Sequence, residues 1–581
     1  MTTTTMSIDD IEDIGEQIDP SIRRYERSAV VFPRTKKHER IETNAKSLPE
    51  GKLVYVKTFG CAHNMSDSEY MCGILASEGY AVTSERAKDA DAWVINSCTV
   101  KDPSEIAFRR VVKEGLDSGK AVVVAGCVPQ AQRDLLEALR PASAIGVKAL
   151  GRVGEAVDAA LRGETFWALS ARGPLPELSM PKIRKHALVE IIPLSTGCLG
   201  SCTYCKTRYA RGKLGSYQLE AIIQRFETAL YDGVAEIWLS SEDTGAYGRD
   251  IGTSLSHLLE ALIVCIDSFS SSKKKPCPTM LRVGMTNPPF VLDQLDALAK
   301  CLKHPNVFAF LHVPVQAGSD TVLKRMNREY TISDFEQVVF GLKQRLGSDF
   351  PLTISTDIIC GFPGENETDF DQTFNLVQRH TFSICHISQF YARQGTPAAK
   401  MRPRVPTSIV KARSRKLSIL INSFNPYASL QDTILRCYAR DELENEYSAT
   451  SRLVAHTKSY VKILIPFRTE YVGAHLHVRV TATHRWHVDA QVIDIILTAD
   501  RDDRPALADA LSRMQPHVHL DDQQQPISNS LPYVSSFLNL KKNFALMNLD
   551  LLGNGPFFFL IALLSAAAAL VYYSFSSPPL L

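Results

Sequence analysis

Three cysteines in one short segment carry the clearest chemical signal in this sequence. Cys198, Cys202 and Cys205 lie in the run STGCLGSCTYCKTRYARG, at C-x3-C-x2-C spacing. Three thiolates this close together can hold three corners of a cubane iron–sulfur cluster. Because the run has no fourth cysteine, one iron would stay open to a bound molecule. The alternative is structural zinc, which needs four protein ligands, and no further cysteine or histidine follows at zinc-finger spacing.

A second set of three cysteines is spread along the N-terminal part of the chain. Cys61, Cys98 and Cys127 each end a short apolar run, and a stretch with a helical pattern follows each. The predicted strands are Leu53–Phe59, Trp93–Ile95 and Ala121–Ala125, and the predicted helices are Ser68–Tyr80, Glu105–Leu116 and Ala131–Leu139. Strand–helix repeats form parallel sheets, whose carboxyl strand ends share one edge. We therefore expect a second metal site there; the alternative is three buried structural thiols.

The middle of the chain predicts six strands that alternate with helices, which favours parallel pairing. These strands are Ala187–Leu194, Glu236–Leu239, Met280–Gly284, Val307–Val313, Leu352–Ile359 and Ser383–Phe390. The predicted fold class is α/β, with a parallel N-terminal domain followed by this six-stranded unit. In barrels of this kind the chemistry gathers at the carboxyl ends of the strands.

Both cysteine trios, in this order, resemble the methylthiotransferase family of radical S-adenosylmethionine enzymes, which add a methylthio group to a nucleoside or an amino acid. The similar segments lie between about Leu53 and about Ile495; they are GCAHNMSDSE, INSCTV, AGCVPQ, the cluster loop, SSEDTGAYGRD, GMTNPP, LHVPVQAGSD, TDIICGFPGE and QFYARQGTPAAKM. SSEDTGAYGRD and GMTNPP are most similar to the eukaryotic and archaeal branch. The resemblance implies conversion of N6-threonylcarbamoyladenosine at tRNA position 37, next to the anticodon, to its 2-methylthio derivative.

The resemblance also implies a partial (β/α)6 barrel and two kinds of cofactor, namely two 4Fe-4S clusters and S-adenosylmethionine. In the family, one cluster splits S-adenosylmethionine to a radical that removes hydrogen from C2 of the adenine, and the other presents a methylated sulfur. The implied metal-binding and catalytic residues are Cys61, Cys98, Cys127, Cys198, Cys202 and Cys205. The implied cofactor-binding residues are Tyr204, Glu242, Asp243, Asn287, Gln316 and Asp357. Read singly, a polar residue at a strand end would be a helix cap or turn residue.

The substrate group suggests further candidates. A threonylcarbamoyl group carries a carboxylate, so its pocket should present a cation or amide donors, and Arg282 and Arg393 are candidates for this role. An isopentenyl group would require an apolar pocket instead. The family chemistry also requires an electron donor and a sulfur source, which the sequence does not identify.

Four short strands after the barrel predict a small β-barrel that resembles the TRAM domain of tRNA-modifying enzymes. They are Arg452–His456, Tyr460–Phe467, His475–Ala482 and Asp489–Leu497, after a polar turn at Asp441–Ser448. Basic and aromatic side chains suit RNA backbone contact and base stacking; they are Arg452, Lys458, Lys462, Arg468, Arg479, Arg485, Tyr460, Phe467, Tyr471 and Trp486. Met401–Leu420 carries six basic residues and no acid. It is either a phosphate-contacting surface or a solvated helix face.

The C-terminal end predicts a membrane anchor. Phe557–Phe575 is a run of 19 almost entirely apolar residues behind a polar segment, Ala499–Asn548, that reads as a linker. As a helix the run would span about 28 Å, close to the roughly 30 Å hydrocarbon core. The alternative is a buried core helix. The uncharged residues after the run favour the endoplasmic reticulum membrane, with the catalytic domains in the cytosol.

Composition is consistent with several domains in a reducing compartment. The chain has 581 residues, 65 basic and 63 acidic side chains, and 13 cysteines without a secreted pattern. The acidic N-terminus predicts no signal or transit peptide. The predicted domains are a mobile extension (1–50), the second-cluster domain (51–165), the radical domain (184–430), the TRAM-like domain (431–497), a linker (498–555) and a transmembrane helix (556–576).

Two other classes of function remain open on the sequence. The same chemistry could act on isopentenyladenosine in tRNA or on an aspartate of a ribosomal protein. A non-enzymatic alternative is a membrane-tethered RNA-binding protein that uses iron–sulfur clusters as redox sensors.

Overall fold

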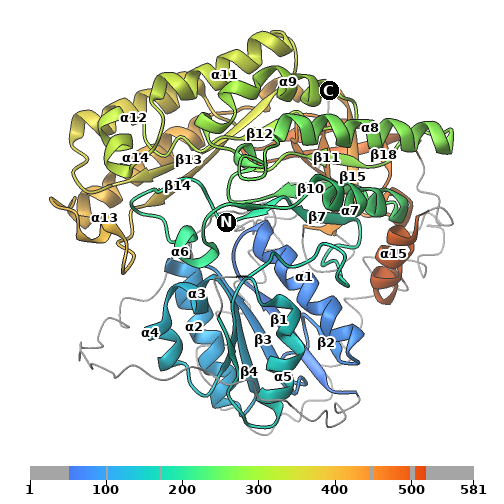
Figure 1. Ribbon diagram of the computed structural model, residues 1–581. Helices are drawn as coiled ribbons and strands as arrows, with labels where there is room; N and C mark the ends of the chain where they lie inside the picture. The colour runs from blue at the N-terminus through green and yellow to red at the C-terminus, as the bar shows by residue number, and fades with distance from the viewer. Residues whose placement is uncertain (1–50, 100–101, 170–172, 445–450, 498–503, 519–581) are drawn as a thin grey trace, which may run out of the picture. The chain divides into compact units, whose positions relative to one another are not determined.

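The computed structural model describes residues 51–99, 102–169, 173–444, 451–497 and 504–518 (Figure 1). The predicted N-terminal extension and the predicted anchor Phe557–Phe575 lie outside these ranges. Within them, no helix is both long and apolar enough to cross a membrane.

The N-terminal region is a parallel sheet with helices on both faces (Figure 1). Its strands are β1 (Leu53–Thr58), β2 (Ala81–Thr83), β3 (Ala92–Ser97), β4 (Ala121–Gly126), β5 (Ser143–Ile145) and β6 (Trp167–Ala168), in the order β2-β1-β3-β4-β5-β6. Its helices are α1 (Ala62–Ser77), α2 (Asp102–Asp117), α3 (Cys127–Ala131), α4 (Arg133–Ala138) and α5 (Val153–Leu161). One apolar core joins the sheet to α1 and α5, and another joins its opposite face to α2 and α4. The three predicted strands are confirmed, whereas β2, β5 and β6 are too short to show a sequence pattern.

A second unit contains six parallel strands, as predicted. They are β7 (Val189–Pro193), β10 (Glu236–Ser240), β11 (Met280–Arg282), β12 (Phe310–His312), β13 (Thr353–Cys360) and β14 (Ile384–Gln389). They form two three-stranded sheets, joined by a parallel bridge between Leu281 and Val307. The outer helices are α7 (Leu219–Asp232), α8 (Leu255–Lys273), α9 (Leu295–Lys303), α11 (Ile332–Leu346), α12 (Glu367–His380) and α14 (Thr407–Ser423) (Figure 1). We call this unit the half-barrel.

Alternation along β11 distinguishes the two faces of the half-barrel. Leu281 and Val283 are buried in the large core that includes the outer helices. Met280 instead packs with Phe308 and Phe310 on the other side of the strands. Because successive side chains in a strand point to opposite faces, Arg282 shares the inner face with Met280.

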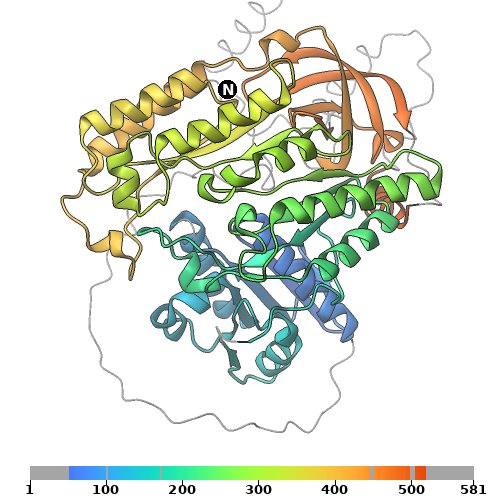
Figure 2. The ribbon, with the colours of Figure 1, turned by 45° about the horizontal axis from the view of Figure 1, so that its top comes forward.

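Five strands after the half-barrel close into a small barrel, which Figure 2 shows in orange. They are β15 (Ile434–Leu443), β16 (Arg452–Thr457), β17 (Lys462–Pro466), β18 (His475–Thr483) and β19 (Val488–Leu497). The four predicted strands are confirmed, but the predicted polar turn at Asp441–Ser448 is wrong at its start, because β15 continues to Leu443. The sequence pattern indicated a turn because the strand ends in a run of charged residues, Arg440, Asp441 and Glu442. Arg440 and Glu442 are both buried and neutralise each other through a hydrogen bond.

The predicted linker 498–555 is wrong over its described part. Residues Pro505–Val518 form helix α15, and Leu507, Leu511 and Met514 are buried in the main core. Arg504, directly before this helix, attaches it to the rest of the protein, because its guanidinium donates to the carbonyls of Gly233 (2.8 Å) and Gly473 (2.7 Å). The segment was predicted to be a linker because it is largely polar, but its apolar residues lie on one face of an amphipathic helix.

Candidate active site

The loop that carries Cys198, Cys202 and Cys205 is fixed at both ends. Strands β8 (Ser195–Thr196) and β9 (Gly215–Ser216) pair in an antiparallel manner at its base. Gly197 adopts a φ of +81°, and a Cβ there would lie 2.3 Å from the Lys213 carbonyl oxygen, so only glycine fits. At its tip, the Thr203 amide donates to the Met326 carbonyl (2.9 Å). The backbone therefore determines where the three cysteines lie.

The sulfurs of this loop turn toward one small region. A Cβ built on Gly200 would lie 3.6 Å from Cys198 Sγ and 3.8 Å from Cys202 Sγ. The third sulfur, Cys205 Sγ, accepts a hydrogen bond from the Thr207 amide (3.3 Å). Burial raises the pKa of Cys198 to about 12. No cysteine of the described residues forms a disulfide, so this trio retains three sulfur donors for a metal.

Arg328 connects the polar groups beside this trio by hydrogen bonds. It was not among the site residues predicted from the sequence. Its guanidinium donates to Cys202 Sγ (3.1 Å), to the Tyr330 hydroxyl (3.1 Å) and to Asn287 Oδ1. The Asn287 amide in turn donates to Asp243 Oδ2 (2.7 Å), and burial raises the pKa of Asp243 to about 6. Two predicted cofactor residues, Asp243 and Asn287, are therefore joined to the cysteine loop through an arginine.

Three further predicted cofactor residues lie around this network. The Tyr204 hydroxyl is 3.5 Å from Arg328 Nη1. Gln316 and Asp357 form a separate pair, in which the backbone N–H of Gln316 donates to the backbone carbonyl of Asp357 (2.8 Å). The Asp357 carboxylate lies 3.1 Å from His312 Nε2. The structure thus divides these predicted cofactor residues between the Arg328 network and a separate pair formed by Gln316, which follows β12, and Asp357 of β13.

The second trio lies at neighbouring strand ends of one sheet. Strands β1, β3 and β4 are neighbours in the sheet, and Cys61, Cys98 and Cys127 lie at their carboxyl ends. A Cβ on Gly60 would lie 2.6 Å from the Cβ of Cys98, so the residue before Cys61 must be glycine. Cys61 is also the N-cap of α1, where the helix dipole favours negative charge.

Asn64 ties the second trio together. Its side-chain amide donates to the carbonyls of Phe59 (2.8 Å) and Ser97 (3.0 Å), which belong to two different strand ends. Its Oδ1 lies 3.8 Å from Cys127 Sγ, and burial raises the pKa of that thiol to about 11. This trio is therefore surrounded by a rigid, hydrogen-bonded shell.

Helix α6 (Thr207–Arg211), which follows Cys205, joins the two trios. Its Ala210 packs in one apolar cluster with Cys127 and Val147. Its Arg211 is buried and donates to Asn64 Oδ1 (2.7 Å) and to Asp67 Oδ2 (2.6 Å). Burial lowers the pKa of Arg211, but the carboxylates around it outweigh this and hold the pKa well above its ordinary value. A permanent cation therefore lies beside the second trio, on the helix that directly follows the cysteine loop.

Glu242, the sixth predicted cofactor residue, belongs to this link. Its Oε1 lies 3.0 Å from Arg211 Nε and 3.4 Å from His63 Nδ1. Burial raises the pKa of Glu242 to about 7. Its Oε2 is buried without a hydrogen-bond partner among the described residues. Glu242 thus faces the N-terminal domain and still has one oxygen available for a bound group.

Two basic residues that we expected on an RNA-facing surface instead attach the small barrel to the half-barrel. Lys458 donates to the carbonyls of Leu302 (2.9 Å) and Val307, and burial lowers its pKa to about 8. Arg485 donates to the carbonyls of Ile421 (2.8 Å) and Ser383 (2.7 Å). Arg468 and Arg479 remain exposed.

Two family models match separate parts of this chain. Residues 53–147 match the Uncharacterized protein family UPF0004, and residues 192–377 match the Radical SAM superfamily. Among solved structures, the radical S-adenosylmethionine methyltransferase TsrM from Kitasatospora setae aligns at 14% identity and a TM-score of 0.43, over 60% of this chain and 77% of that one.

Curated relatives align over most of their length. The threonylcarbamoyladenosine tRNA methylthiotransferase of Drosophila pseudoobscura is 45% identical over 84% of this chain and 88% of its own. The proteins of the same name from Danio rerio (44%; 82% and 85%) and Homo sapiens (43%; 84% and 83%) are similarly close. The chain belongs to the threonylcarbamoyladenosine tRNA methylthiotransferase family.

Proposed function

We propose that this chain converts N6-threonylcarbamoyladenosine in tRNA to its 2-methylthio derivative, a reaction of the EC 2.8.4 class. The observation that carries this proposal is the packing of helix α6, which directly follows the cysteine loop, on the second site, where Ala210 and Cys127 share one apolar cluster. A reaction that brings a radical and a sulfur to one carbon atom requires its two centres to be neighbours. We take the identity of the substrate from the relatives, whose names state this activity.

The two donor sets fit the cofactors of the family, which are S-adenosylmethionine and 4Fe-4S clusters. Each site offers three cysteine sulfurs, which leaves one iron of a cubane without a protein ligand. Cys198, Cys202 and Cys205 would hold one cluster, and Cys61, Cys98 and Cys127 the other. When bound, these groups supply the one-electron cleavage of S-adenosylmethionine and the sulfur chemistry.

The residues of the chain position and shield the reacting groups. Arg328 keeps Cys202 and Asn287 in fixed places, while Asp243 and Asn287 present oxygen and nitrogen atoms that suit an amine or ribose hydroxyls. We assign Tyr204, Gln316 and Asp357 to the same cofactor. Glu242 lies apart from these residues, because its Oε1 pairs with Arg211. Its Oε2 has no hydrogen-bond partner among the described residues and could accept one from a bound group.

Arg211 has a positioning role in this proposal. It holds Asn64 and Asp67 of α1 against the helix that follows the radical loop. Since all these groups are buried, they exclude water from the space between the sites. Removal of water protects reactive species and strengthens local electrostatic interactions.

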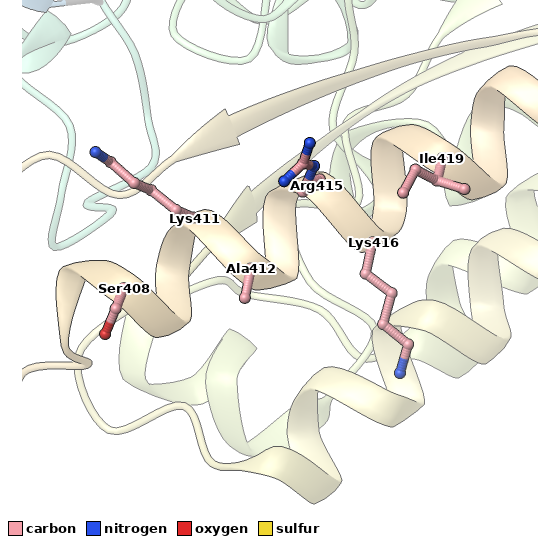
Figure 3. Close-up of a pocket in the computed structure, with 6 residues that line it drawn as sticks. All are labelled: Ser408, Lys411, Ala412, Arg415, Lys416 and Ile419. Atoms are coloured by element: carbon pink, nitrogen blue, oxygen red, sulfur yellow. The ribbon is translucent and has the colours of Figure 1, made fainter.

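Exposed basic residues support tRNA binding outside the site. On α14, Ser408, Lys411, Arg415 and Lys416 line a shallow hollow, in which Lys411 and Arg415 extend from one side of the helix (Figure 3). Arg413 of the same segment is not part of this surface, since it pairs with Glu365 (2.8 Å). The exposed Arg468 and Arg479 of the small barrel, which we take to be a TRAM domain, are further candidates. Phosphate contacts of this kind position a nucleic acid without reading its bases.

The predicted domain boundaries and the anchor are part of the proposal. We place Phe557–Phe575 in the endoplasmic reticulum membrane, with the catalytic domains in the cytosol. A variant that ends at Asp550 should be extracted from membranes by carbonate and should still modify tRNA. Retention of this variant in the membrane fraction would contradict the anchor.

A direct competition tests the substrate. Reduced, cluster-loaded enzyme is given equal amounts of two otherwise identical tRNAs, one threonylcarbamoylated and one isopentenylated, and nucleosides are quantified by mass spectrometry. We expect a preference for the threonylcarbamoylated tRNA of roughly 10⁴-fold, because polar partners in a site reject an analogue that leaves them unpaired. Equal products, a preference for the isopentenylated tRNA, or methylthiolation of a ribosomal protein alone would contradict the proposal.

A further inference from the structure

Arg282 lies deep on the inner face of the half-barrel. It is the last residue of β11, and it pairs in register with Trp238, two residues before β10 ends at Ser240. Asp243 and Asn287 lie beyond these strand ends. Arg282 is therefore further inside the half-barrel than the groups assigned to the cofactor.

Three aromatic rings surround its guanidinium. The Arg282 Cζ lies 4.7 Å from the ring centre of Tyr460, 5.0 Å from that of Trp238 and 5.2 Å from that of Phe310. Tyr460 belongs to the small barrel, so two domains form this cage. Aromatic faces stabilise a cation, and they also hold it in one orientation.

The Arg282 guanidinium differs from three buried arginines of this chain, because it has no polar partner among the described residues. Arg211, Arg413 and Arg440 each face a buried carboxylate. By contrast, Arg282 Nε is buried, and no acceptor among the described residues takes a hydrogen bond from Arg282. The side chain is nevertheless partly exposed, so a solute can reach it. A caged cation with unused donors is suited to an incoming anion.

The position favours a carboxylate carried by the substrate base. A tRNA phosphate is attached to the backbone, which cannot follow a base into the half-barrel. A group on N6 of the adenine can extend inward from a base held at the strand ends, and a planar guanidinium binds a carboxylate through two parallel hydrogen bonds. The other candidate, Arg393, donates to the Tyr204 carbonyl (3.5 Å) and therefore lies at the cysteine loop.

We infer that Arg282, caged by Trp238, Phe310 and Tyr460, binds the carboxylate of the threonylcarbamoyl group and determines specificity for it. This inference rests on the proposed function. It assigns to one side chain the discrimination between a charged and an uncharged N6 substituent.

The test compares two substrates across three enzymes. The substrates are threonylcarbamoylated tRNA and the same tRNA with that carboxylate converted to a primary amide. The enzymes are the wild type, Arg282→Gln and the matched control Arg393→Gln, and the readout is kcat/KM for methylthiolation. Cleavage of S-adenosylmethionine without tRNA and thermal unfolding report whether a variant retains its fold and its radical site.

The wild type should prefer the acid over the amide by roughly 10- to 100-fold, the value of a charge-assisted hydrogen bond pair. In Arg282→Gln this preference should fall to about one, while Arg393→Gln should retain it. An unchanged preference in Arg282→Gln would overturn the inference, as would its loss in Arg393→Gln alone. If Arg282→Gln unfolds, Arg282→Lys replaces it, and a preference equal to that of the wild type would count against a role for the guanidinium fork. Absence of product from the wild type on the acid substrate would instead contradict the proposed function.

Discussion

The two cysteine sites each offer three sulfur donors, but the cysteines are arranged differently along the chain. Cys198, Cys202 and Cys205 occupy one loop, which a short β-ribbon closes at its base. Cys61, Cys98 and Cys127 come from three separate strand ends, which the order of the sheet makes neighbours. The three loop cysteines are partly exposed, whereas in the second trio Cys98 and Cys127 are buried and Cys61 is partly exposed.

This difference separates two functions. A partly exposed loop can admit a small-molecule cofactor to an open iron. A site built from the ends of a packed sheet takes its ligands from three elements that the sheet holds side by side. Substitutions should therefore disable the two sites in distinguishable ways.

Loss of the loop site should have the largest effect. Cys202→Ala is expected to abolish cleavage of S-adenosylmethionine, and with it all product, because a cluster held by two cysteines is not retained. Iron content should fall by about four atoms per chain. The control is Cys265→Ala on α8, outside both sites. Normal formation of 5′-deoxyadenosine by Cys202→Ala would refute the assignment of the loop.

Loss of the second site should be selective. Cys98→Ala should still cleave S-adenosylmethionine but should yield no methylthio product, since the radical site keeps all its ligands. Both products are measured in the same reaction by mass spectrometry. If methylthiolation continues at the wild-type rate, Cys98 is a core residue only.

A change at Arg211 should weaken the connection between the sites. Arg211→Met leaves Asp67 and Glu242 without their cation, which should cost about 3–5 kcal/mol of stability. Adding Asp67→Asn removes one unpaired charge and should restore part of the melting temperature. The yield of methylthio product per 5′-deoxyadenosine should be roughly tenfold lower than in the wild type in both variants. The reason is that the two cysteine sites would no longer be held in the right relative position, and misaligned reactants react slowly. A normal yield in the double variant would show that Arg211 serves stability alone.

The surface of α14 should give the smallest effect. Lys411→Glu together with Arg415→Glu should weaken tRNA binding similarly for all sequences and reduce the salt dependence by about one unit of slope per lost contact. Lys273→Glu on α8 is the control. Unchanged binding, measured by filter retention at several salt concentrations, would identify α14 as a solvated helix face.

The sequence predicted what is local or periodic. The loop trio is visible as a spacing, and the second trio follows from three strands that each end in cysteine. Arg328 and Arg211 could not be found this way, because Asn287 lies 41 residues from Arg328 and Asn64 lies 147 residues from Arg211. The only local signal was an arginine directly beside the cysteine loop, in the run TRYARG. Lys458 and Arg485 illustrate the converse, since a basic side chain does not reveal whether it faces solvent or a neighbouring domain.

The cage around Arg282 has a consequence for how the protein is made. The six cysteines of the two trios all lie within the first 205 residues, and Arg282 follows soon after them. Tyr460 and Lys458 are synthesised much later, and domains fold in order as they leave the ribosome. A chain translated only as far as residue 430 therefore holds every cluster ligand while the inner face of its half-barrel still lacks the ring of Tyr460. Translation itself thus delays completion of the cage around Arg282 until all six of these cysteines have been synthesised.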